Sequence, residues 1–113
     1  MKYADFGTVS HGTLRDADLL RSFGDELEYH VKRNAKALDK NTRKRYLALV
    51  KEAAGLNPDD ASDDEFEFVL DLVHGLMDAL DKFSPPDGYF GPHPGDGADF
   101  GFWPSEDNRE NVP

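Results

Sequence analysis

The segment that could carry chemistry most directly is HPGDGADFGFW, residues 93–103, and its letters ADFG also occur near the start, at residues 4–7. The triplet DFG is part of the magnesium site of protein kinases, which also need a glycine-rich loop, a strand lysine and a catalytic loop. A chain of 113 residues holds no such set. The two triplets therefore predict similar local structure, in which a turn-forming aspartate stands beside a buried ring.

The letters GDGAD within this segment resemble ion- or phosphate-binding loops. A calcium-binding nonapeptide repeat needs stacked copies, and an EF-hand loop needs oxygen ligands at alternate positions and a terminal glutamate. A GxGxxG phosphate cradle needs a strand before it and a helix after it. The sequence offers none of these contexts. We therefore expect a tight turn with exposed aspartates.

Histidines are the other residues suited to acid–base or metal chemistry. No two of the four histidines have metal-ligand spacing, and no HExxH motif is present. His30 and His74 fall within helical patterns, where we expect surface or boundary positions. The sequence thus predicts no metal and no cofactor.

Two histidines lie in glycine-containing loops, His11 in SHGT and His93 in PHPGDG. If the two ends of the chain pack together, these imidazoles would share a polar site with Asp96 or Asp99. The alternative is that each imidazole braces its own loop.

There is no cysteine, and no serine lies in a nucleophile-elbow context. We expect a protein that is not an enzyme, and a small enzyme with a His11/His93 site is the third of three hypotheses.

Aromatic residues flank the glycine-rich turn and predict a C-terminal β-hairpin. We expect Phe100, Phe102 and Trp103 to cover the open end of a helical core. If some of the rings stay partly exposed, they form an aromatic anchor patch of the kind that dominates protein interfaces. The candidate partner-binding residues are Tyr89, Phe90, His93, Asp96, Asp99, Trp103 and His11.

Charge is distributed in blocks along a chain whose net charge is −10. Residues 32–51 hold eight lysines and arginines against Asp39 alone, whereas residues 52–113 hold sixteen acidic residues against Lys82 and Arg109. Opposite blocks favour association between copies of the chain, or attraction of a charged partner. The simpler interpretation is a solvated, soluble surface.

The acidic balance, with a pI near 4.6, argues against direct nucleic-acid binding. A dense carboxylate surface can instead imitate a phosphate backbone and occupy a DNA-binding enzyme of a host cell. This acidic mimic is the second functional hypothesis. Its face would consist of Asp59, Asp60, Asp63, Asp64, Glu65 and Glu67.

Length and composition predict one globular domain, residues 1–103, followed by a polar tail at 104–113. No apolar run is long enough for a membrane span, and the first residues lack the apolar stretch of a signal peptide. Together with the absence of cysteine, this predicts a cytoplasmic protein without membrane contact.

Hydrophobic periodicity predicts a mainly helical α+β fold with three helices. The first runs from Thr13 to about Leu38, the second from about Thr42 to Ala54, and the third from Ser62 to the double proline after Phe83. Gly24 indicates a close contact or a bend in the first helix. Alternating residues before Ser10 can add a third, edge strand to the C-terminal hairpin.

The segments VSHGTLR, residues 9–15, and GYFGPHPGDGADFGFW, residues 88–103, together resemble small uncharacterised proteins of bacteriophages, notably phages of actinobacteria. The resemblance covers about a fifth of the chain, and Asp16 stands where those proteins often have proline. It implies a phage accessory protein in a bacterial cytoplasm and brings no activity. The first hypothesis is therefore a non-enzymatic protein-binding module that acts on a host or phage protein.

Overall fold

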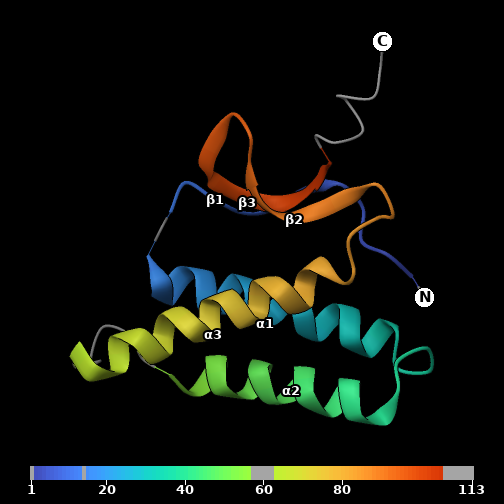
Figure 1. The fold of residues 1–113 in the computed structure, drawn as a ribbon, viewed down its shortest axis with the longest axis horizontal. Helices are drawn as coiled ribbons and strands as arrows, with labels where there is room; N and C mark the ends of the chain where they lie inside the picture. The colour runs from blue at the N-terminus through green and yellow to red at the C-terminus, as the bar shows by residue number, and fades with distance from the viewer. Residues whose placement is uncertain (1, 14, 57–62, 106–113) are drawn as a thin grey trace.

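The computed structural model describes residues 2–13, 15–56 and 63–105, and for 63–66 the backbone alone. Within this part the chain is an α+β fold with the order β1, α1, α2, α3, β2, β3. Figure 1 shows three layers: the sheet lies on one side of α1 and α3, and α2 lies on the other side. The predicted fold class is confirmed.

Helix α1, Asp16–Arg33, is shorter than predicted at both ends. Thr13, predicted as its first residue, lies before the helix, and its hydroxyl accepts from the Arg15 amide and donates to the Asp18 carboxylate. At the C-terminal end the Asn34 side chain donates to the His30 carbonyl and to the Lys2 carbonyl. Asn34 thereby ends the helix and holds the N-terminal segment against it, a long-range role that periodicity cannot reveal.

Helix α2, Lys40–Gly55, begins after Asp39, whose carboxylate accepts from the Thr42 amide as an N-cap. It packs mainly against α1, where a Cβ added to Gly24 would lie 3.6 Å from the Ala53 Cβ. The close contact predicted at Gly24 is therefore present.

Helix α3, Asp63–Asp81, ends before the turn that contains the two prolines, as expected.

The sheet has the order β1-β3-β2, with both pairings antiparallel. Strands β2, Gly88–His93, and β3, Asp96–Pro104, form the predicted hairpin. Strand β1, Gly7–His11, pairs with β3 and supplies the predicted third strand, so the two ends of the chain meet. Because Pro104 is the last residue of β3, the tail predicted at 104–113 begins inside the sheet. Residues 106–113 lie outside the described chain.

The sheet is fastened to the helices by aromatic rings. Phe23 of α1 meets Phe90 and Phe100 edge-on, with ring centroids 5.2 and 5.4 Å apart. Phe102, 1% exposed, packs against Phe90 at 5.0 Å. Phe90, Phe100 and Phe102 are all buried. The predicted covering of the helical core is therefore correct for Phe100 and Phe102, whereas Trp103 is half-buried and is not part of the core.

His30 is buried, at 2% exposure, which corrects the expectation that it lies at the surface. Its ring stacks on Phe83 and meets Phe102 edge-on, and Glu26 accepts a hydrogen bond of 2.9 Å from its Nε2. The expectation failed because α1 is in the middle layer, so its buried surface is wider than one stripe. His74 on α3 is exposed, as predicted.

Gly101 lets β1 and β3 approach each other. A Cβ at this position would clash with the Gly7 carbonyl, which is backbone and cannot move aside independently. Gly97, in the same strand, has nothing within 4 Å of a Cβ added there. Both positions are glycine, but only at position 101 does contact with a neighbouring strand require a residue without a Cβ.

We predict that Phe102→Ala lowers the free energy of unfolding by about 3–5 kcal/mol, because it removes a buried ring and leaves a cavity. Chemical denaturation measures this loss. Phe68→Ala is the matched control, because Phe68 is 49% exposed on α3, and its cost should stay below about 1 kcal/mol. Equal losses in the two variants would contradict the structure.

We predict that Gly101→Ala detaches β1 and destabilises the fold by about 1–3 kcal/mol, as overpacking does. Hydrogen exchange at the Gly12 amide, which donates to the Ala98 carbonyl, reports on this pairing. Protection of that amide should be lost in Gly101→Ala and kept in Gly97→Ala. Retained protection in both would show that β1 does not need the glycine.

Candidate functional site

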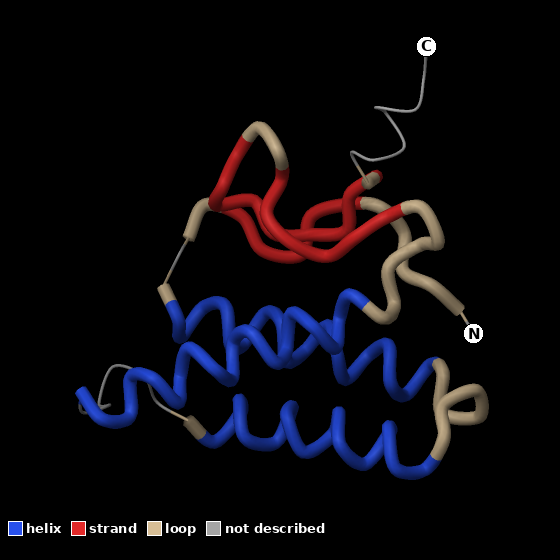
Figure 2. Tube along the Cα trace, in the orientation of Figure 1, coloured by secondary structure: helices blue, strands red, loops and turns tan. Residues whose placement is uncertain are grey.

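The side of the sheet that faces away from the helices is the candidate functional site. Figure 2 shows all three helices on the opposite side of the strands. Because side chains alternate along a strand, inward Phe90 and Phe102 place their neighbours Tyr89 and Trp103 on the other side. We call this surface the outer sheet face. Its ring-bearing members, Tyr89, His93 and Trp103, are called the Trp103 end, and its polar members, Thr8, His11, Asp96 and Asp99, the polar end; the two groups adjoin where His93 pairs with Asp96.

Trp103 and Tyr89 are half-buried and held by their own polar atoms. The Trp103 indole N–H donates to the Gly91 carbonyl at 3.0 Å, and the Tyr89 hydroxyl donates to the Pro92 carbonyl at 3.0 Å. A Cβ on Gly91 would lie 3.3 Å from the Tyr89 ring, so this glycine gives the ring space to lie flat. The two rings are thus fixed before any partner arrives.

A hollow of about 500 Å³ lies beside the indole. The His93 ring meets Trp103 edge-on at 4.8 Å, and the His93 Nδ1 accepts a 2.9 Å hydrogen bond from the Gly95 amide. Among the residues that the structure describes, the hollow is lined by His93, Pro94, Gly95, Trp103 and Pro104, none of which is Lys, Arg, Asp or Glu. An uncharged, rigid hollow with an aromatic wall is suited to an apolar side chain.

The other end of the outer sheet face is polar. His11 pairs with Asp99 across β1 and β3, and its Nε2 lies 3.5 Å from the Asp96 Oδ2. The Thr8 hydroxyl donates to Asp99 Oδ1 at 2.8 Å. The expected meeting of His11 with these two aspartates is therefore present. His93 makes other contacts and braces its own turn, which was the alternative expectation.

The prediction that Phe90 contacts a partner is wrong. It is buried at 6% exposure between Phe23 and Phe102, so a partner cannot reach it. Inward and outward rings of one hairpin cannot be separated from sequence until the register is known.

The acidic face stays a prediction. Asp59 and Asp60 lie outside the described residues, and Asp63, Asp64 and Glu65 form the start of α3 without described side chains. Glu67 is exposed.

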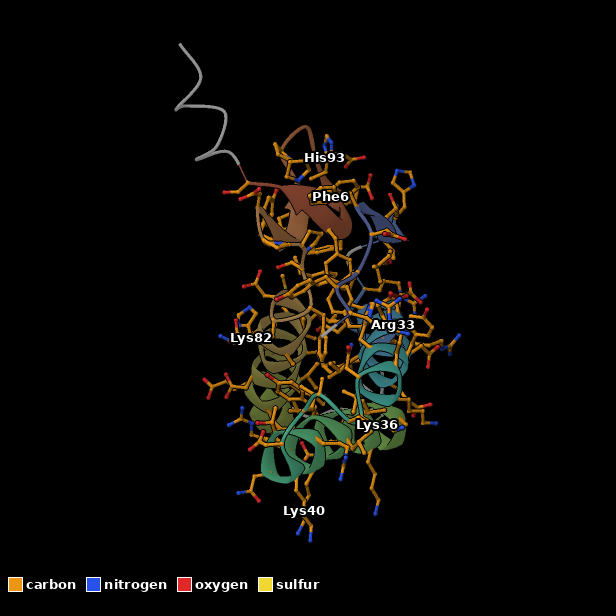
Figure 3. All side chains as sticks on the ribbon, turned by 90° about the vertical axis from the view of Figure 1, so that its right-hand side faces the viewer. Phe6, Arg33, Lys36, Lys40, Lys82 and His93 are labelled. Atoms are coloured by element: carbon orange, nitrogen blue, oxygen red, sulfur yellow. The ribbon has the colours of Figure 1, made fainter. Side chains whose placement is uncertain are left out.

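The basic block, 32–51, runs from the end of α1 through most of α2. Figure 3 shows Lys36 and Lys40 at the end of the molecule opposite Phe6 and His93. These two lysines are therefore remote from the outer sheet face, and none of the three strands contains a lysine or arginine.

Asp81, which sequence reasoning missed, closes the free edge of β2. Its carboxylate accepts a 2.9 Å hydrogen bond from the Phe90 amide, and the Gly88 amide donates to the Pro85 carbonyl. Pro92 has no amide hydrogen to offer. A partner strand therefore finds no free donor at these alternate positions, and strand addition at this edge is disfavoured.

No known protein family, curated protein or solved structure matches this chain. Among the described residues, no helix combines the length and apolar character that crossing a membrane requires.

We predict that Asp81→Ala destabilises the protein by about 1 kcal/mol. The substitution removes a hydrogen bond to a charged group, which typically contributes about 1.5–3 kcal/mol to stability. Part of that loss is offset, because a carboxylate at a helix C-terminus is itself unfavourable. Asp78→Ala is the control, since Asp78 lies in the same last turn and should be neutral or slightly stabilising. The unfolding temperatures of both variants show whether each substitution lowers or raises the stability of the protein.

Proposed function

We propose that this protein is a non-enzymatic accessory protein that binds a protein partner through the Trp103 end of its outer sheet face. The observation that carries the proposal is the hollow beside Trp103, whose described lining residues include no Lys, Arg, Asp or Glu and whose wall is already fixed by the indole hydrogen bond. Aromatic anchors in preformed, desolvated pockets dominate the energetics of protein interfaces.

The chemistry of the hollow favours an apolar side chain of the partner. The Trp103 N–H and the Tyr89 hydroxyl are both engaged by backbone carbonyls, so the rings offer mainly apolar surface. Prolines on either side add rigid apolar walls. Such a contact should persist in salt, because it does not depend on charge.

The resemblance of residues 9–15 and 88–103 to actinobacterial phage proteins indicates where to look for the partner. Both segments contribute to the sheet, β1 from the first and the β2–β3 hairpin from the second. We therefore place the protein in the cytoplasm of a bacterial host, where it would act on a host or phage protein.

The test is affinity capture from an actinobacterial lysate with immobilised wild-type protein, Trp103→Ala and Phe68→Ala. We expect at least one protein that wild type and Phe68→Ala retain and that Trp103→Ala loses. The purified partner should then bind Trp103→Ala more than about tenfold more weakly, the loss typical of an interface hot spot. Circular dichroism confirms that each variant is folded.

Salt separates this proposal from the acidic mimic. A contact through the Trp103 hollow should survive a high-salt wash, whereas an acidic mimic should release its target. Equal capture by wild type and Trp103→Ala would overturn the proposal. If the captured protein were also a DNA-binding enzyme released by salt, the acidic mimic would take its place.

A further inference from the structure

The geometry points to a binding site for one divalent transition-metal ion, of the zinc class, formed by His11, Asp96 and Asp99. This site belongs to the polar end of the outer sheet face and shares no residue with the described lining of the Trp103 hollow. It does not depend on the proposed protein-binding function.

The three side chains converge closely enough to share an ion. Each offers one ligand atom, and the three atoms lie within 4.8 Å of one another. Two ligands on a tetrahedral ion with bonds of about 2.0–2.1 Å lie roughly 3.4 Å apart. The His11 Nε2 and Asp96 Oδ2 are already 3.5 Å apart. Small side-chain rotations therefore suffice to complete the set, and His11 and Asp96 are exposed enough to make them.

Each carboxylate has one oxygen held by a neighbour and one that is directed elsewhere. Thr8 donates its hydroxyl hydrogen to Asp99 Oδ1, and the Ala98 amide donates to Asp96 Oδ1. The Oδ2 atom of Asp96 is the one that faces His11. Outer hydrogen bonds of this kind fix ligand orientation in metal sites and strengthen metal binding.

Electrostatics also favours a cation at this position. Two carboxylates close together repel each other, and no residue of the three strands is a lysine or arginine that could offset them. His11 is the basic side chain that the structure places against them. A divalent ion would supply the missing positive charge.

The ligand types select the class of ion. One imidazole with two carboxylates suits zinc and similar ions, whereas calcium and magnesium prefer oxygen ligands in larger number. Three protein ligands leave a position open for water or for an atom of another molecule. Because His11 belongs to β1 and both aspartates to β3, bound metal would also clamp the first strand to the hairpin.

The experiment titrates the full chain with zinc chloride by isothermal calorimetry, with calcium and magnesium chloride as separate arms. We expect one zinc ion per chain in the micromolar range and weaker binding of the other two ions. In ¹H–¹⁵N spectra, the amides of residues 8–11 and 96–99 should shift together, and zinc should raise the unfolding temperature of the wild type.

Variants locate the site. His11→Ala and Asp99→Asn should each weaken zinc binding by more than about tenfold, and Thr8→Val by up to about tenfold, as loss of an outer hydrogen bond does. His74→Ala, which changes an exposed histidine on α3, is the matched control and should bind as wild type does. The proposal is overturned if wild type binds no zinc at one per chain, or if His11→Ala binds zinc unchanged.

Discussion

The edge-on contact of Phe23 with Phe90 and Phe100 determines most of what this molecule can present to its surroundings. It fastens the sheet to the middle layer of helices and fixes which side of each strand faces inward. Since strand residues alternate, the inward rings leave Tyr89 and Trp103 on the opposite face. The same hairpin thus holds the fold together on one side and offers aromatic surface on the other.

A second constraint is the close approach of β1 to β3 at Gly101. It joins segments from the two ends of the chain and pairs His11 with Asp99. Without this approach, the polar end of the outer sheet face would hold two aspartates and no imidazole. A steric requirement on one residue therefore decides the chemistry available several ångströms away.

The outer sheet face combines two features: aromatic rings in fixed positions and a closed edge on the neighbouring strand β2. The indole and phenol are fixed by backbone carbonyls of their own strand, and the edge of β2 is closed by Asp81 and Pro92. The β2 edge is thereby protected from indiscriminate strand pairing. The outer sheet face remains suited to a specific contact through side chains, and helix α2, with its basic residues, lies on the side of α1 and α3 that is opposite the sheet.

The three helices, the hairpin and the inward covering by Phe100 and Phe102 could be predicted from the sequence, because hydrophobic period and turn residues are local signals. The sequence also indicated that His11 and His93 would share a polar site with Asp96 or Asp99 if the chain ends packed together, and the structure shows this contact for His11. Only the tertiary structure decided that the ends meet, that His30 and Phe90 are buried, and that His93 braces its own turn. The physical reason is that these outcomes depend on which layer covers an element and on strand register, which are set by contacts between residues far apart in the chain.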